Sequence, residues 1–272
     1  MNNSPSENLQ IIQHNTARSR EIMHSVLDTA GRKGAHFVLI QEPYVVGDDF
    51  SITISHPNYL CTLPTNPDNI RPRVAIYAKR ISKYSYCHRS DLTQDSDLLI
   101  LDVSESGLGS NSELQNQGLK FQLINIYNER SLNDRYQGYT IPRALVKLNP
   151  EENALICGDF NAHHHWWNSK IGTEIRSTEL IEWVNKFDFE LINEPDVMTF
   201  CKKRQNPDRV SESVIDLAFA RGPVKQTIAN WSVDDENASG SDHAMIQIEI
   251  QSNSSSSVMN PLLKPHNLQK AA

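Results

Sequence analysis

The chain lacks the features of membrane, secreted and thiolate-metal proteins. No apolar run approaches the roughly 20 residues of a membrane-spanning helix, and the polar residues 1–10 lack the basic-then-apolar layout of a signal peptide. The four cysteines lie far apart, without a Cys-X-X-Cys pair. We therefore expect no membrane partner and an intracellular, reducing compartment, with nucleus and cytoplasm both open.

An excess of positive charge is also lacking. The formal net charge is −7, which argues mildly against a protein that holds nucleic acid by overall electrostatic attraction. It does not exclude a nuclease, because carboxylates that hold a metal ion count as negative charges although the ion reverses the local potential. Basic residues do gather locally, as at Lys202–Arg204, and such a group is ordinary solvated surface unless it borders an acidic site.

Short apolar segments bounded by turn residues indicate strands along most of the chain. They are expected at Leu9–His14, His36–Gln41, Val74–Ala78, Leu98–Val103, Leu119–Tyr127, Ala154–Cys157, Val214–Phe219 and Ala244–Ile250. No convincing helix separates the strands between residues 74 and 127, so this part is expected to be antiparallel. The polar stretches 104–118 and 199–209 are expected to form loops.

Three segments have helical patterns. An apolar stripe predicts a helix over Arg18–Ala30, stopped by Gly31. A second helix is expected over Asp134–Leu148, kinked or restarted at Pro142. A third is expected over Ser177–Phe187, with its first residue, a serine, as the cap.

The order of these elements indicates the fold class. Strands occur at both ends of the predicted domain, with mixed βα and ββ segments between them, which is typical of two packed sheets covered by helices. We expect one α/β (α+β) domain over residues 8–250, with mostly antiparallel or mixed sheets. Residues 251–272 are rich in Ser, Asn and Pro and are expected to form a flexible polar tail.

Polar residues stand at the ends of the predicted strands, where sites in α/β proteins tend to lie. They are Asn15, Glu42, Tyr127, Asp159, Asn161, Asp216, Asp242 and His243. With no cysteine among them, this set suits a hard, oxygen-liking metal ion and a phosphate better than zinc or a thiol nucleophile. Asp216 is flanked by apolar residues, and burying a lone carboxylate is costly. We therefore expect it to pair with a histidine from a neighbouring strand.

These positions also have purely structural interpretations. Asp159 and Asn161 could cap the turn that follows a strand. Asp242 and His243 could likewise form a turn at the start of the next strand. Tyr127 could be amphipathic packing at a strand end. The consecutive histidines at 163–165 point in different directions and cannot all bind one ion, so only His163 is expected to line a site.

Six motifs, taken in order, carry a family resemblance. They are Gln13-His14-Asn15, Gln41-Glu42-Pro43, Asn125-Ile126-Tyr127, Gly158-Asp159-Phe160-Asn161, Ile215-Asp216 and Ser241-Asp242-His243. The set resembles the endonuclease/exonuclease/phosphatase superfamily of abasic-site endonucleases, DNase I-like nucleases and inositol phosphatases. The closer likeness is to the endonuclease domain of non-LTR (LINE-like) retrotransposons. The resemblance spans about residues 9–250 and implies a DNase I-like, four-layer α/β/β/α sandwich.

The resemblance implies a metal side of the site. Glu42 would bind Mg²⁺, or Mn²⁺ in its place, with water and phosphate oxygens completing the shell. Asn15 would help to position that carboxylate or the ion, and Asp242 would be a further carboxylate on the metal side. Substrate contacts are expected from Lys202, Lys203, Arg204 and His163.

The resemblance also implies a phosphate side. Asp159 would orient or deprotonate the attacking water, and Asn161 would hold the scissile phosphate. His243, paired with Asp216, would donate a hydrogen bond to a phosphate oxygen. Tyr127 would contribute a phenolic donor to the same phosphate.

Three functions compete. The first is a Mg²⁺-dependent DNA endonuclease whose nick leaves the 3′-hydroxyl that primes reverse transcription in such elements. The second keeps the fold but acts on abasic DNA, RNA or a phosphoinositide, since specificity lies in loops. The third is a non-catalytic nucleic-acid-binding relic. Related proteins continue into a reverse transcriptase domain, which this chain does not contain.

Overall fold

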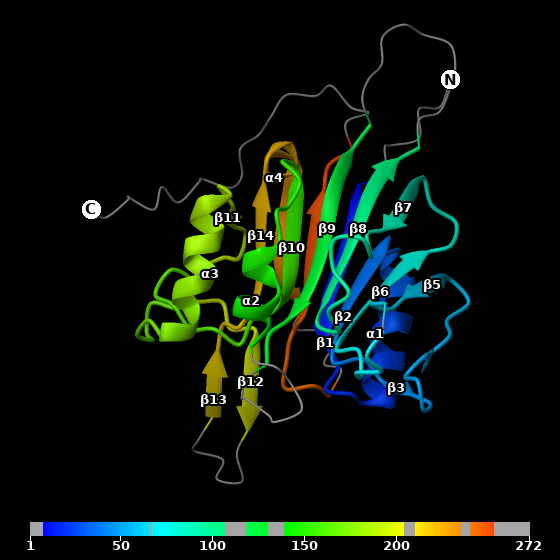
Figure 1. Cartoon of the computed structure of the whole chain (residues 1–272), viewed down its shortest axis with the longest axis horizontal. Helices are drawn as coiled ribbons and strands as arrows, with labels where there is room; N and C mark the ends of the chain where they lie inside the picture. The colour runs from blue at the N-terminus through cyan, green and yellow to red at the C-terminus, as the bar shows by residue number, and fades with distance from the viewer. Residues whose placement is uncertain are drawn as a thin grey trace, which may run out of the picture.

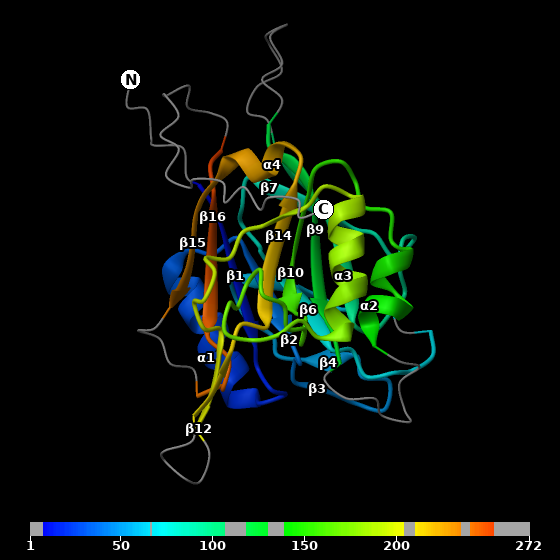
Figure 2. The ribbon, with the colours of Figure 1, turned by 90° about the vertical axis from the view of Figure 1, so that its left-hand side faces the viewer.

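The computed structural model describes residues 8–65, 67–106, 118–129, 139–203, 210–234 and 240–252. Two six-stranded sheets pack face to face, and helices cover their outer faces (Figure 1, Figure 2). The expected four-layer α/β/β/α sandwich is therefore confirmed. The domain limits 8–250 stay a prediction, and the predicted tail lies outside the described residues from residue 253 onward.

Each sheet is mixed, with a single parallel pair of neighbours. In order across the first sheet, the strands are β15 (Ile228–Asp234), β16 (Met245–Ile250), β1 (Leu9–Asn15), β2 (Phe37–Gln41), β6 (Val74–Lys79) and β5 (Tyr59–Thr62). The second sheet has the order β11 (Glu190–Leu191), β14 (Asp216–Arg221), β10 (Ala154–Asp159), β9 (Lys120–Tyr127), β8 (Leu98–Glu105) and β7 (Tyr84–His88). The parallel pairs are β1 with β2 and β9 with β10. Of the middle strands expected to be antiparallel, β8 and β9 pair with each other in that way, whereas β6 lies in the first sheet and pairs antiparallel with β2.

The helices lie on opposite sides of the sheets. Helix α1 (Arg20–Lys33) covers the first sheet, and α2 (Thr140–Arg143), a 3₁₀ turn over Leu145–Lys147 and α3 (Ile175–Lys186) cover the second (Figure 1). A short helix, α4 (Pro223–Thr227), follows β14. Two small hairpins complete the described elements: β3 (Val45–Val46) with β4 (Ile52–Thr53), and β12 (Phe200–Lys203) with β13 (Val210–Ser213).

Three apolar layers hold the sandwich together. Side chains alternate between the two faces of a strand, so each sheet supplies two layers. Ile11 of β1 and Leu155 of β10 point into the core between the sheets. Their chain neighbours point outward, Ile12 toward α1 and Ile156 toward α2 and α3. Because both faces are covered, the strands are apolar along most of their length.

The predicted limits of the first helix were wrong at both ends. Arg18 has a positive φ of 61°, so the helix begins only at Arg20, where the Ser19 side chain accepts a hydrogen bond from the Ile22 N–H. Gly31 does not stop it. The helix ends at Lys33 because Gly34 takes the left-handed conformation, with a φ of 72°.

The other two helices also differ from prediction. The predicted Asp134–Leu148 helix is broken at Ala144, whose φ and ψ are −123° and −50°, and residues 130–138 lie outside the described part. In α3, Ser177 is not the cap. Glu174 stands at that position, and the Ser177 hydroxyl donates to its carbonyl oxygen at 2.6 Å from within the first turn.

Several smaller expectations can be compared with the structure. In the predicted loop 199–209, Phe200–Lys203 form the strand β12, and residues 204–209 lie outside the described part. In the predicted loop 104–118, β8 runs on to Glu105, and residues 107–117 are not described. The four cysteines are free. Within the described ranges, no helix combines the length and the apolar character needed to cross a bilayer.

Candidate active site

The polar strand ends meet at one edge of the sandwich. Parallel pairing brings the C-terminal ends of β9 and β10 together, so that Asp159 lies level with Tyr127. On its other side, Asp159 lies level with Asp216, the first residue of β14. In the first sheet, Asn15 lies level with Gln41, the residue before Glu42. These ends surround a cleft of about 460 Å³.

Most of the site residues predicted from the sequence line this cleft. They are Asn15, Glu42, Tyr127, Asp159, Asn161, His163, Lys202, Asp242 and His243. Asp216 does not line it, because it is buried and paired with the His243 ring. The Lys203 side chain and the whole of Arg204 lie outside the described residues. Phe200, Ile171 and Ile215 add an apolar part to the wall.

Asp159 is a buried carboxylate held by amide groups. The Asn15 side-chain N–H donates to its Oδ2 at 3.0 Å, and the Asn161 backbone N–H donates to its Oδ1 at 3.0 Å. The preceding residue, Gly158, lets β10 lie close to β9, because an added Cβ would lie 1.9 Å from the Ile126 carbonyl oxygen. The sequence thus places Asp159 at a fixed depth, with two donors aimed at it.

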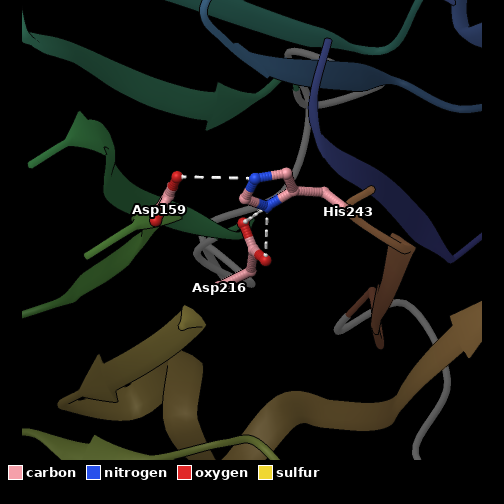
Figure 3. A group of neighbouring side chains, drawn as sticks. All are labelled: Asp159, Asp216 and His243. Atoms are coloured by element: carbon pink, nitrogen blue, oxygen red, sulfur yellow. Dashed lines mark hydrogen bonds and ion pairs between the residues drawn. The ribbon is translucent and has the colours of Figure 1, made fainter. Parts of the chain in front are cut away.

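His243 and Asp216 form the expected buried pair (Figure 3). The ring Nδ1 lies 2.9 and 3.1 Å from the two carboxylate oxygens of Asp216. The other ring nitrogen, Nε2, lies 3.9 Å from Oδ2 of Asp159. Asp216 therefore orients the ring so that Nε2 faces Asp159, as Figure 3 shows.

Burial acts differently on the two groups that face each other. Burial, followed by the negative charge of Asp216, raises the pKa of the Asp159 carboxyl. For His243, burial lowers the pKa, but the charge and hydrogen bond of Asp216, together with the charges of Asp159 and Glu42, outweigh it and raise the pKa to about 9. At neutral pH His243 is therefore a cationic donor beside a carboxyl group that accepts protons readily.

Asn161 and Tyr127 line the cleft beside Asp159. Asn161 has a left-handed backbone, with φ of 44°, a conformation that non-glycine residues adopt mainly where their surroundings impose it. Its side-chain N–H donates to the Asn128 carbonyl at 2.9 Å, which fixes the amide plane. Burial and then the charges of Glu42 and Asp159 raise the pKa of Tyr127, so its phenol stays protonated and can donate.

Glu42 reaches the cleft from a strained loop. Its φ is 47°, and its backbone accepts a hydrogen bond from the Arg18 N–H at 2.8 Å. The Arg18 guanidinium also contacts the Glu42 carboxylate at 2.6 Å. The Asn15 side chain is directed elsewhere: its N–H donates to Asp159, and its Oδ1 accepts the Ala17 N–H at 2.9 Å. Asn15 thus positions a carboxylate, and that carboxylate is Asp159.

The hairpin β12–β13 borders the opposite side of the cleft. The Lys202 ammonium lies 3.2 Å from the half-exposed carboxylate of Asp242. The ring of Phe200 packs edge-on against His243, with 4.9 Å between the ring centroids. Phe200 thus covers one side of the His243 imidazole, a contact that the sequence analysis did not predict.

Thr199 joins the segments that carry the buried pair, a role that no pattern in the sequence indicates. Its hydroxyl oxygen accepts hydrogen bonds from the N–H groups of Ile215 and Asp216, at 3.1 and 3.0 Å. Its carbonyl accepts the Ala244 N–H at 2.7 Å. Thr199 therefore contacts the backbone on both sides of the Asp216–His243 pair, and it is fully buried.

The donor set fits a divalent metal ion. Asp159, Asp216 and His243 offer ligand atoms that all lie within 4.8 Å of one another, although two of them are already paired with each other. The carboxylates of Glu42, Asp159 and Asp242 line the cleft itself. Carboxylate oxygens without thiolates suit Mg²⁺ or Mn²⁺. The cleft carboxylates therefore offer suitable ligands for such an ion, whereas the His243 imidazole is already paired with Asp216.

Comparisons with known proteins give one matching family model and several solved structures of similar fold. A family model described as endonuclease-reverse transcriptase matches residues 121–247. No curated protein matches the chain in sequence. Among solved structures, the endonuclease domain of TRAS1, a telomere-specific non-LTR retrotransposon, is 21% identical, with 89% of this chain and 98% of that chain covered and a TM-score of 0.67.

Two abasic-site (AP) endonucleases are also similar. LMAP from Leishmania major is 14% identical over 91% of this chain and 89% of its own, with a TM-score of 0.65. The enzyme from Archaeoglobus fulgidus is 16% identical over 89% and 99%, with a TM-score of 0.58. The chain therefore has the DNase I-like fold of the endonuclease/exonuclease/phosphatase superfamily, and the resemblance drawn from its motifs is confirmed. Within that superfamily, the matching family model is that of the endonucleases linked to reverse transcriptases.

Proposed function

We propose that the protein is a Mg²⁺-dependent endonuclease that hydrolyses one phosphodiester of DNA and leaves a 3′-hydroxyl. The observation that carries the proposal is the pair of groups on one cleft, a buried proton-accepting Asp159 and a cationic His243, with Nε2 and Oδ2 3.9 Å apart. The match to the endonuclease-reverse transcriptase model supports the reaction class.

Asp159 serves as the general base. Its raised pKa brings proton acceptance closer to neutral pH, where such a base is most effective. The donors from Asn15 and Asn161 keep its two oxygens in place. A water molecule that donates to Asp159 is thereby directed at the phosphorus, and Asp159 receives its proton as the new P–O bond forms.

His243, Asn161 and Tyr127 hold the phosphate. His243 donates from Nε2 to a non-bridging oxygen, and Asp216 stabilises the imidazolium while charge develops. Asn161 and Tyr127 supply neutral donors from the same wall. A bound Mg²⁺ would be held by Glu42 and Asp242 and would supply Lewis-acid stabilisation of the phosphate oxygens and of the leaving oxygen.

The products follow from the atoms exchanged. The water oxygen becomes part of a 5′-phosphate, the bond between phosphorus and O3′ breaks, and O3′ takes up a proton to become a hydroxyl. Such an end is a primer for DNA synthesis, so a reverse transcriptase is the partner activity that the proposal implies. The four free cysteines support a reducing compartment.

A substrate panel tests the proposal. Folded protein would be incubated with Mg²⁺ and end-labelled duplex DNA, the same duplex with an abasic site, RNA, or a phosphoinositide. We expect cleavage of intact duplex DNA to give ends that a DNA polymerase extends without prior phosphatase treatment. Cleavage confined to abasic DNA, RNA or the phosphoinositide would show that intact DNA is not the substrate. Ends that need phosphatase treatment before extension would contradict the proposed 3′-hydroxyl product. No turnover of any of these substrates would favour the non-catalytic binding relic.

A further inference from the structure

Arg73 is a fully buried arginine directly before β6, with its guanidinium in a network of carboxylates. Its side chain is 0% exposed. Its Nε donates to Oδ1 of Asp97 at 2.6 Å, its Nη2 contacts the other oxygen of Asp97, and its Nη1 contacts Glu129. Such two-pronged pairing fixes the plane of the guanidinium as well as its position.

The network is anchored on the second sheet and on α2. Asp97, also fully buried, accepts further hydrogen bonds from the Arg143 guanidinium at 2.6 Å and the Thr140 hydroxyl at 3.0 Å. Arg143 in turn contacts Asp95 at 2.7 and 2.8 Å. Arg73, which directly precedes β6 of the first sheet, is thereby tied to the second sheet by charged contacts that leave its guanidinium little room to rotate.

The same guanidinium lies over Tyr127. The Arg73 Cζ is 4.9 Å from the centroid of the Tyr127 ring, within the range of a cation–π contact. The Tyr127 backbone N–H donates to the Asp97 carbonyl at 3.0 Å. Both the ring and the backbone of Tyr127 therefore take their position from the Arg73–Asp97 pair.

The Arg73 backbone contacts the other wall of the cleft. Its carbonyl accepts the Glu42 N–H at 2.8 Å. Glu42 has a positive φ of 47°, a conformation that must be imposed by surrounding contacts. Arg73 is thus in contact with one cleft residue of each sheet, Glu42 and Tyr127.

We infer that Arg73 is a positioning residue of the nuclease site, which sets the Tyr127 phenol relative to Glu42 across the cleft. The inference rests on the proposed phosphodiesterase function. A buried ion pair is weak evidence of a stabilising role, because well-packed apolar residues often replace it without loss. Its place between two cleft residues gives this arginine a task that an apolar side chain could not perform.

A double-mutant cycle on nicking tests this inference. Arg73→Lys keeps the charge but loses the fork that holds the guanidinium plane, and Tyr127→Phe removes the phenol. We expect Arg73→Lys to lower kcat by roughly 100-fold, as small misplacements can, with KM for DNA within about twofold. Because both changes act through Tyr127, the double variant should be no slower than the slower single variant.

Arg89→Lys is the matched control, since Arg89 also forks onto a carboxylate of the same sheet region, Asp91, with two contacts of 2.8 Å. The Arg89→Lys variant should retain the wild-type kcat. Each variant is assayed at the same interval below its own Tm, so that differences in stability do not affect the comparison. The inference would be overturned if the effects of the two substitutions on kcat multiplied in the double variant, or if Arg73→Lys and Arg89→Lys lost equal activity. In either case, nicking by the wild type would leave the proposed function intact. An inactive wild type would overturn both.

Discussion

Two buried aspartates of the second sheet show how neighbours decide what a carboxylate does. Asp97 directly precedes β8 and Asp159 ends β10, and their exposed fractions are 0% and 1%. Burial alone would raise the pKa of both. At Asp97 the hydrogen bonds and charges of Arg73 and Arg143 outweigh burial and lower the pKa. At Asp159, burial and the negative charge of a second carboxylate, Asp216, together raise the pKa.

The difference separates a structural carboxylate from the one that we propose to be reactive. Asp97 meets two guanidinium groups that hold it permanently charged. Asp159 has amide donors and an imidazole, and among the described residues no lysine or arginine pairs with it. A group that must accept and release a proton needs the second environment. The same residue type thus has opposite roles two strands apart.

Asp159→Asn is expected to produce the largest effect. The amide keeps the shape but cannot accept a proton, so single-turnover cleavage should fall by roughly 10²–10⁴-fold. The free energy of unfolding should be unchanged or higher, because a buried acid of raised pKa gives way to a neutral group. Cleavage rates and thermal unfolding of the same preparation check both parts. A variant that cleaves at the wild-type rate would contradict the role proposed for Asp159.

Asp97→Asn should instead act on stability. Removing one partner of a buried ion pair typically costs about 3–5 kcal/mol in the free energy of unfolding. The folded pKa of Asp97 is lowered, so the stabilisation is complete above its ordinary value of 3.8 and fades as the pH falls through the folded pKa. Denaturant unfolding at pH 7 and pH 3 measures this. The exposed Asp91→Asn is the control, with an expected change of about 0–1 kcal/mol.

Thr199→Val should have an intermediate effect on stability. It leaves the buried N–H groups of Ile215 and Asp216 without their acceptor, at about 1–3 kcal/mol for each group. Thr199→Ser retains the oxygen and should stay close to wild type. If valine and serine behave alike in denaturant unfolding, the hydroxyl is not what joins these segments.

Asp216→Asn should change the pH dependence of cleavage, with its smallest effect at acidic pH, where His243 is protonated with or without the Asp216 charge. The pKa of His243 is raised to about 9, so the wild-type imidazolium donor is lost only as the pH rises through that value. Without the Asp216 charge, burial lowers the pKa, and the alkaline limb of kcat should move to lower pH. A pH profile whose alkaline limb does not move would show that Asp216 does not tune this histidine.

Much of the site was predictable because its residues follow strong local signals. Asp159, Asn161 and His243 stand beside apolar strands, and these strands form a sheet whose ends converge. The resemblance in motifs predicted that these residues act in one reaction. Edge strands were missed where they lack an apolar run, as in β7 (Tyr84–His88), in which Tyr84 is buried and the other four residues are exposed or half-buried.

Supporting residues were missed for a different reason. Thr199 contacts the backbone of Asp216 from 17 positions away, and Arg73 meets Asp97 from 24 positions away. Nothing in the local pattern of either residue distinguishes it from a surface threonine or arginine. Such contacts exist only once the strands have paired, so the sequence alone gave no basis for them.

The most direct test of the central claim is nicking of supercoiled plasmid by the wild type, with Mg²⁺ and with EDTA, beside Asp159→Asn and His243→Ala. We predict metal-dependent conversion to the nicked circle by the wild type and its loss in both variants, with all three proteins folded. Nicking that persists in EDTA or in both variants, or no nicking by folded wild type, would contradict the account.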